Sequence, residues 1–242
     1  MRPAPRAQVS VLHGTNYVVP PSRLPRVVTV YDCWFLRHPE LADPAVHRAG
    51  LVLRRAVRTG ATVHATSHAT AAAVRDLLAT DAVEVIPLAA PPTRPVAVAP
   101  TMDDAPAIAG RLATRPYVLA LGTIERRKNL PTLIAAFGRM DSAGSPLLVI
   151  AGADGDDRAA VDAAIGQLDA SARERVVLTG RIDDATKQWL LAHARVLAYP
   201  SLDEGFGFPL LEAMAADVPI VASTAGSIPE VAADAAVLVD AA

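Results

Sequence analysis

The chain has 242 residues, of which 52% are hydrophobic and 4% aromatic, so it can bury a large aliphatic core. The formal net charge of −2 excludes the basic footprint expected of a nucleic-acid-binding protein. A single cysteine, Cys33, excludes an internal disulfide and a cysteine-based metal site.

The first part of the chain alternates short aliphatic runs with longer segments of helical period, the pattern of successive βα units. Strands are predicted at Val9–His13, Val27–Tyr31, Thr62–Thr66 and Val83–Pro87. Helices are predicted at Pro44–Thr59 and His68–Thr80. About four strands are fewer than a doubly wound domain needs, so we expect a partial domain over residues 1–88.

The helix predicted at Pro44–Thr59 is amphipathic and basic. One stripe is apolar and the opposite face is cationic, carrying His47, Arg48, Arg54, Arg55 and Arg58. We favour a core-packed helix with a solvated basic face, and contact with anionic lipid headgroups is the alternative. No leader pattern and no apolar run of ~18 residues is present, so we expect a cytoplasmic protein, with peripheral contact at the inner face of the membrane left open.

A proline-dense stretch without any period follows, and we predict a linker over residues 89–115. A second α/β domain is predicted over 116–242, lacking its closing helices. Its strands are predicted at Tyr117–Leu121, Leu147–Ala151, Val176–Leu178, Val196–Tyr199, Pro219–Ala222 and Ala236–Val239. Its helices are predicted at Leu130–Met140, Asp157–Leu168, Asp184–Ala194, Pro209–Ala216 and Ser227–Ala233. The fold class is therefore α/β, with two partial doubly wound parallel-sheet domains.

A glycine-rich loop between two acids follows the predicted strand Val196–Tyr199 and opens the next helix. It begins with Glu204, continues through Gly205, Phe206 and Gly207, and reaches Glu212 after Pro209. We expect both glycines to take positive φ angles and the helix N-terminus to favour an anion such as a phosphate. The two acids are too far apart to be partners, so we expect them to hold hydroxyls at separate points of an extended ligand. A ligand with a phosphate between two hydroxyl-rich ends fits a nucleotide sugar.

A cationic loop follows the predicted strand Tyr117–Leu121. Arg126, Arg127 and Lys128 stand there before a helix for which Asn129 is a natural N-cap. Because parallel strands end at one edge of the sheet, we expect these cations to lie beside the glycine-rich loop and to suit a diphosphate.

The Glu204-x7-Glu212 spacing, the EGFG loop and the segment GTIE-x-RKN resemble the retaining GT-B glycosyltransferases of family four, the group-one type that includes mannosyltransferases. Segments of the first domain, VVTVYDCWFLRHPEL among them, extend the resemblance over nearly the whole chain. The resemblance implies two Rossmann-like domains that transfer a hexose from a nucleotide diphosphate sugar to an acceptor hydroxyl with retention of configuration.

By that resemblance, Glu204 would hold a hydroxyl of the donor sugar, Glu212 the ribose hydroxyls, and Arg127 with Lys128 the departing diphosphate. The backbone near Arg181 and Ile182 would face the base, and glycine-loop amides would contact sugar or phosphate; the donor-contacting backbone residues are Gly122, Gly205, Phe206 and Gly207. No metal or other cofactor is expected, because preorganised cations stabilise the leaving group. The partners implied are the donor and a saccharide, lipid-linked or small-molecule acceptor.

The chain departs from the family pattern at particular positions. Tyr31 stands where the family usually has a histidine that faces the donor sugar, and a phenol there could still donate a hydrogen bond. Thr123 replaces a frequent arginine, and the glycine loop of the family's first strand–helix unit is not in this chain. These departures leave a second class open, a non-catalytic nucleotide-binding or partner module of the same fold. An epimerase or phosphorylase is a third reading for which no characteristic motif is evident.

Overall fold

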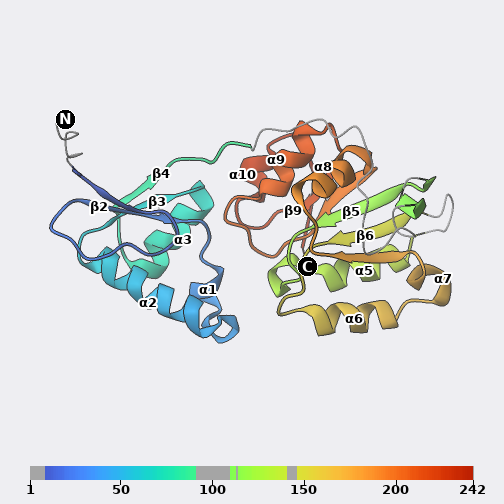
Figure 1. Cartoon of the computed structure of the whole chain (residues 1–242), viewed down its shortest axis with the longest axis horizontal. Helices are drawn as coiled ribbons and strands as arrows, with labels where there is room; N and C mark the ends of the chain where they lie inside the picture. The colour runs from blue at the N-terminus through green and yellow to red at the C-terminus, as the bar shows by residue number, and fades with distance from the viewer. Residues whose placement is uncertain (1–8, 91–109, 113, 141–145, 242) are drawn as a thin grey trace, which may run out of the picture. The chain divides into compact units, whose positions relative to one another are not determined.

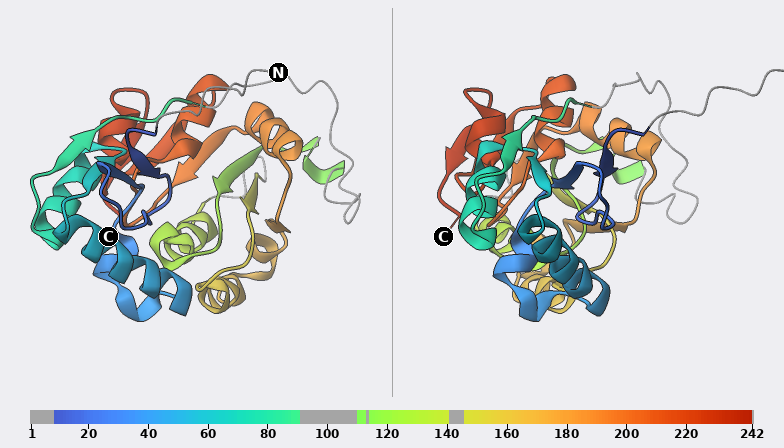
Figure 2. Two further views of the ribbon diagram at one scale, coloured as in Figure 1. Left: turned by 60° about the vertical axis from the view of Figure 1, so that its left-hand side comes forward. Right: turned by 90° about the vertical axis from the view of Figure 1, so that its left-hand side faces the viewer.

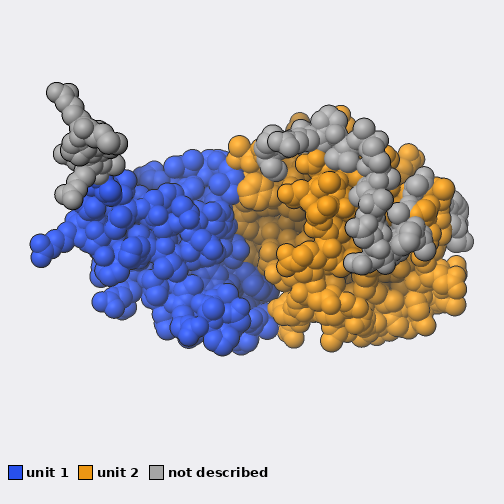
Figure 3. Space-filling view, in the orientation of Figure 1, with its two compact units in different colours: residues 1–88 blue, residues 89–242 orange. Residues whose placement is uncertain are grey.

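The computed structural model describes residues 9–90, 110–112, 114–140 and 146–241. The chain divides into two compact units, residues 1–88 (unit 1) and 89–242 (unit 2), coloured separately in Figure 3. Of the predicted linker, residues 91–109 and 113 lie outside the described residues. Each unit contains one parallel sheet, of four strands in unit 1 and six in unit 2, which confirms the predicted α/β fold class.

The sheet of unit 1 has the strand order β1-β2-β3-β4, with every neighbouring pair parallel. Both long helices pack against the same buried face of this sheet, whose core includes Val28, Val63 and Leu53. The elements of unit 1 are β1 Leu12–Gly14, β2 Arg26–Val30, α1 Trp34–Arg37, the 3-10 helix η1 Pro39–Leu41, α2 Pro44–Arg58, β3 Thr62–Ala65, α3 His68–Leu78 and β4 Val83–Val85 (Figure 1).

Local chemistry sets where the two long helices of unit 1 begin. The Asp43 carboxylate accepts hydrogen bonds from the first free amides of α2, and Pro44 occupies the first turn, where a missing N–H costs nothing. Ser67 caps α3 in the same way through Thr70 N–H. The predicted arginine face of α2 is incomplete, because Arg54 donates to the Leu77 carbonyl at the end of α3.

Unit 2 is built on the strand order β10-β9-β8-β5-β6-β7, again all parallel. Helices α5 and α6 cover one face of the sheet, and α8, α9 and α10 cover the other (Figures 1 and 2). Its elements are β5 Tyr117–Leu121, η2 Arg126–Lys128, α5 Leu130–Gly138, β6 Leu147–Ala151, α6 Arg158–Gly166, α7 Ala170–Arg173, β7 Val176–Gly180, α8 Asp184–His193, β8 Val196–Tyr199, α9 Phe208–Ala215, β9 Ile220–Ser223, α10 Ile228–Ala232 and β10 Val237–Val239.

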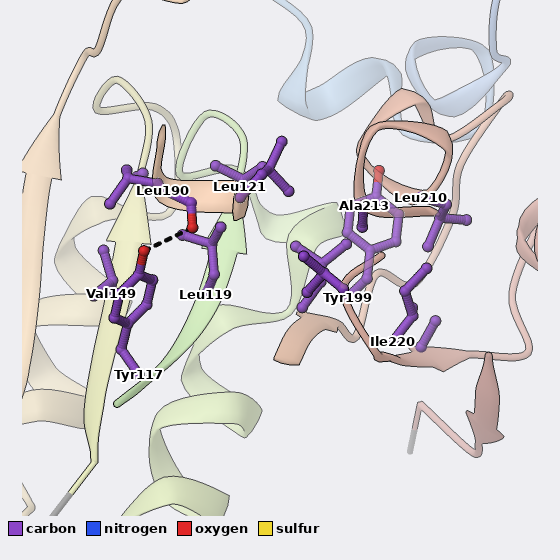
Figure 4. Close-up of a cluster of buried hydrophobic side chains, with 14 of the residues drawn as sticks. Tyr117, Leu119, Leu121, Val149, Leu190, Tyr199, Leu210, Ala213 and Ile220 are labelled. Atoms are coloured by element: carbon purple, nitrogen blue, oxygen red, sulfur yellow. Dashed lines mark hydrogen bonds between the residues drawn. The ribbon is translucent and has the colours of Figure 1, made fainter. Parts of the chain in front are cut away.

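Strand β5 separates the two cores of unit 2, because alternate side chains point to opposite faces. Tyr117 and Leu119 join the core under α8, α9 and α10, whereas Ala120 packs with α5 and α6. The Tyr117 hydroxyl donates to the Leu190 carbonyl at 2.7 Å, and burial raises the pKa of this phenol (Figure 4). The sheet is therefore a rigid support whose loops hold the polar residues.

The structure corrects several predicted boundaries. Strand β1 begins at Leu12 rather than Val9, since pairing with β2 starts at the Leu12–Arg26 partners. Strand β4 ends at Val85 rather than Pro87, and helix α5 ends at Gly138 rather than Met140. The short elements α1, η1, η2 and α7 were not predicted, because three or four residues carry too little periodicity to be recognised.

Candidate functional site

The polar residues of unit 2 gather where the strand order reverses. From β5 the chain proceeds outward through β6 and β7, whereas β8, β9 and β10 extend on the other side. The loops after β5 and β8 therefore leave neighbouring strands at the carboxyl edge, which is where open α/β sheets bind ligands. A main-chain hydrogen bond of 2.7 Å from Leu202 N–H to the Arg127 carbonyl joins the two loops.

Glu204 is held between two cations from the opposite loop. Its Oε1 accepts from Lys128 Nζ at 2.5 Å, and its Oε2 accepts from Arg127 Nη1 at 2.8 Å. Lys128 Nζ also donates to the Tyr199 hydroxyl at 3.1 Å. Glu204 is 7% exposed and Lys128 is equally buried, so the charges attract each other with little screening by water. These four residues are the Glu204 cluster.

Burial and charge oppose each other in the Glu204 cluster. Burial by itself would raise the pKa of the Glu204 carboxyl, but Lys128 and Arg127 outweigh it and hold that pKa below its usual value. Burial lowers the pKa of Lys128 against the attraction of Glu204, and the 2.5 Å contact between them is that of an ion pair. Burial, reinforced by the Glu204 charge, raises the pKa of the Tyr199 phenol, which therefore stays neutral.

Two glycines make room for the Glu204 cluster. A Cβ on Gly122 would lie 3.1 Å from Lys128 Cε, and its φ of +131° is a conformation that side chains rarely adopt. A Cβ on Gly226 would lie 2.5 Å from the Glu204 carbonyl oxygen, at a φ of +55°. The predicted Gly122 therefore lies at the site, and Gly226, which the sequence did not single out, supports the Glu204 backbone from the loop after β9.

The glycine-rich loop behaves partly as predicted. Gly207 has a φ of +90° and immediately precedes α9, with Pro209 in the first turn. Gly205 is not among the positive-φ residues, so that expectation was wrong for it. Phe206 is buried and meets Phe208 edge to face at 5.5 Å between ring centroids. Phe206 is thus the buried member of the pair, while Phe208 is 39% exposed.

The second acid has a different partner. Glu212 lies on α9, is 8% exposed, and accepts from Lys187 Nζ of α8 at 2.7 Å. Lys187 also pairs with Asp184 at 3.4 Å. Burial by itself would lower the pKa of Lys187, but the contact with Glu212 outweighs it and the pKa is raised. Lys187 and Glu212 are the Glu212 pair, and the chain's two lysines thus bind the two motif acids.

Sequence reasoning did not identify Lys187. The one feature of the sequence that could have drawn attention to Lys187 is that the chain has only two lysines, of which the other is Lys128. Arg126, by contrast, is exposed, and its backbone N–H bonds Asp156 rather than Glu204. Asn129 occupies the N-cap position of α5 but does not cap with its side chain, whose amide donates to the Ala241 carbonyl at 3.0 Å. The expectation that the Asn129 side chain caps α5 was therefore wrong.

The remaining predicted residues lie on other segments. Arg181 and Ile182 follow β7, where Arg181 is exposed and Ile182 packs on the core of unit 2. Tyr31 belongs to unit 1, at the end of β2, and its hydroxyl donates to the Thr15 carbonyl at 2.9 Å. Its ring meets Tyr17 edge to face. The Tyr31 proton is thus already engaged within unit 1.

Two further features concern only the part of the chain that the structure describes. Within these ranges, no three His, Cys, Asp or Glu side chains are grouped so that they could hold a metal ion. None of the described helices is both long and apolar enough to cross a bilayer.

The fold and the site together define a class. Two parallel α/β sheets, with a cationic loop and an acidic glycine loop at the reversal of strand order, have the architecture of the GT-B glycosyltransferases. WaaG, a glycosyltransferase involved in lipopolysaccharide biosynthesis, shares the fold with a TM-score of 0.69 at 18% identity, over 94% of this chain and 64% of that one. Anabaena Alr3699/HepE, solved with UDP-glucose, gives a TM-score of 0.64 at 22% identity, over 86% and 56%.

The family follows from the sequence itself. The profile of the family "Glycosyl transferases group 1" matches residues 102–242, more than half of the chain, and the chain belongs to this family. The O-antigen chain mannosyltransferase B of Escherichia coli is 37% identical over 134 residues, which are 54% of this chain and 34% of that protein. The chain spans about a third or less of the length of such curated relatives.

Proposed function

We propose that the chain carries the donor-binding half of a retaining hexosyltransferase that uses a nucleotide diphosphate sugar. The observation that carries the proposal is the convergence of Arg127 and Lys128 on one point at the carboxyl edge of the sheet. Both cations are paired with acids there, Lys128 with Glu204 and Arg127 with Glu204 and Glu125. A diphosphate entering there would meet a guanidinium and an ammonium, which suit its paired anionic oxygens.

The proposed reaction needs a stabilised leaving group. The bond between the anomeric carbon and the diphosphate oxygen breaks with its electron pair on the diphosphate, and the acceptor oxygen bonds to the anomeric carbon. The acceptor proton leaves to a diphosphate oxygen, so atoms and charge balance. Arg127 and Lys128 would stabilise the negative charge as it develops, once the diphosphate has drawn them in part from Glu204.

Each acid of the motif would hold hydroxyls. Glu204, beside the cations, would accept from a hydroxyl of the sugar, and Glu212, on α9, from the ribose. The exposed backbone after β7, at Arg181, would face the base, and the backbone of Gly122, Gly205, Phe206 and Gly207 the sugar and phosphates. The names of the relatives support a mannose or glucose donor, and the acceptor would be a saccharide, a lipid-linked or a small-molecule hydroxyl.

Calorimetry on the whole chain tests the donor site. Titration with UDP, GDP and ADP should give binding with at least one nucleotide, and Arg127→Gln with Lys128→Met should abolish it. Arg158→Gln is the control, because Arg158, the first residue of α6, forms exposed pairs with Asp154 in the preceding loop and with Asp162 on the helix. Absence of binding to every nucleotide, or equal binding by the double variant, would refute the donor site.

The second candidate is a non-catalytic nucleotide-binding module. One observation favours it: the Tyr31 hydroxyl is engaged by the Thr15 carbonyl. Incubation with UDP-glucose or GDP-mannose and an acceptor panel, followed by proton NMR of the anomeric signal, separates the two. A product with retained configuration supports the transferase, inversion contradicts retention, and binding without turnover supports the module.

A further inference from the structure

Lys187 contacts the acid for which a ribose-binding role is proposed, yet no motif includes it. Its ammonium lies 2.7 Å from Glu212 Oε1, and it reaches there from helix α8, which packs beside α9. Glu212 is almost completely buried, and a carboxylate in such a place is costly unless a cation or hydrogen bonds compensate for it. Lys187 supplies that compensation.

The two oxygens of Glu212 are used differently. Oε1 accepts from Lys187, whereas none of the described residues is recorded as donating to Oε2. This contrasts with Glu204, both of whose oxygens are bound to cations. A carboxylate fixed by one oxygen with the other available is prepared to accept from a ligand hydroxyl.

Lys187 is itself held in place. It projects from the first turn of α8, which Asp183 caps through Thr186 N–H at 2.7 Å. Asp184 lies 3.4 Å from the same ammonium but is 92% exposed, so it restrains the lysine little. The lysine side chain is 29% exposed, so its position is restricted by both packing and charge.

We infer that Lys187 is a positioning residue for ribose recognition: it holds the Glu212 carboxylate by Oε1 and keeps it turned so that Oε2 faces the ribose hydroxyls. The inference rests on the proposed nucleotide site. Without Lys187, the Glu212 carboxylate would lose the contact at Oε1 and turn toward water, so Oε2 would no longer be held in place to accept from the ribose. Contacts with the diphosphate, which are assigned to Arg127 and Lys128, would remain.

The test compares a ribonucleotide with its 2′-deoxy counterpart by calorimetry. The nucleoside diphosphate that binds the wild-type chain best among UDP, GDP and ADP is used with its 2′-deoxy form. Since a hydrogen bond to a charged group contributes a factor of roughly 10 to 100, the wild type should prefer the ribonucleotide by at least about tenfold. Lys187→Met should reduce the preference to about twofold or less, mainly by weakening ribonucleotide binding.

Matched variants separate positioning from folding. Lys187→Arg keeps a cation at this place and should retain most of the preference. Asp184→Asn removes only the exposed partner of Lys187 and should leave the preference unchanged. If Lys187→Met lacks a cooperative melting transition, Lys187→Gln, which is closer in polarity, is compared with Lys187→Arg instead.

Each outcome decides one question. If the wild type binds none of the nucleotides, the proposed function fails and the inference fails with it. If the wild type prefers the ribonucleotide and Lys187→Met or Lys187→Gln keeps that preference, the inference fails and the proposed function stands. If the variant weakens the ribonucleotide and the deoxyribonucleotide equally, Lys187 acts as a general cation for the phosphates and the assignment to ribose is overturned.

Discussion

The Glu204 cluster and the Glu212 pair belong to one loop–helix segment, but they are organised in different ways. Glu204 has both carboxylate oxygens bound to cations that come from another loop, and a glycine packs against its backbone. Glu212 has one oxygen bound to a lysine that is partly exposed and shared with Asp184. The first region is a closed buried network, and the second is an open pair.

The two regions differ in how the buried carboxylate is compensated, and therefore in which contacts a ligand must displace. A donor diphosphate at the first region must draw Arg127 and Lys128 away from Glu204, at least in part. A ribose at the second region has only to approach an available oxygen. We therefore expect substitutions in the Glu204 cluster to affect stability strongly, and substitutions in the Glu212 pair to affect it weakly.

The largest effect is expected for Glu204→Gln. The substitution leaves the buried Lys128 ammonium without a carboxylate, whereas Arg127 keeps Glu125 at 2.7 Å, and breaking a buried ion pair in this way costs about 3 kcal/mol. Urea unfolding followed by tryptophan fluorescence in a Trp34→Phe background reports on unit 2, because Trp189 is then the only tryptophan. A loss below about 1 kcal/mol would mean that the cluster is solvated.

The same loss should disappear in acid. The pKa of Glu204 is lowered in the folded protein, so its stabilisation is fully present above the usual glutamate value of about 4.3 and is lost as the pH falls through the lowered pKa. The free energies of unfolding of the wild type and Glu204→Gln should therefore converge as the pH falls below about 4.3. A difference that is constant with pH would show that the carboxylate charge is not responsible.

A smaller effect is expected for Gly226→Ala. The added Cβ would meet the Glu204 backbone at 2.5 Å with φ at +55°, so we expect a loss of about 2 kcal/mol. Gly166→Ala is the matched control, because a Cβ there meets nothing within 4 Å at the end of α6, and it should be neutral or stabilising by up to about 1 kcal/mol. Equal melting temperatures of the two variants would contradict the supporting role of Gly226.

The smallest effect is expected for Glu212→Gln. Lys187 keeps Asp184 as a partner and remains partly in water, so the loss in stability should be about 1 kcal/mol or less. Urea unfolding of this variant beside Glu204→Gln measures the comparison directly. A loss equal to that of Glu204→Gln would show that the second region is as closed as the first.

The sequence was sufficient to predict those elements whose pattern lies within a few consecutive residues. Strands β5, β6 and β8 have their predicted bounds, because each is an aliphatic run bounded by turn residues. The start of α9 beside Pro209 and the α/β class were likewise predictable. That the cationic loop meets the glycine loop was also foreseen, since parallel strands share an edge.

What the sequence could not supply depends on residues far apart in the chain. Lys187 and Glu212 are 25 positions apart, and their pairing follows from the packing of α8 beside α9. The Asn129 side chain was expected to cap its own helix, but it bonds a carbonyl 112 positions away. Sequence propensities describe only local preferences, whereas the partners of these two side chains are set by tertiary packing.

The bond between Leu202 N–H and the Arg127 carbonyl gives Arg127 two separable tasks. Its guanidinium binds the Glu204 carboxylate, and its carbonyl binds the backbone of the loop that follows β8. Conventional scanning of side chains removes only the first task and leaves the second intact. Ester replacement of the amide at position 202, which deletes the N–H and keeps the side chain, would isolate the mechanical linkage between the two loops.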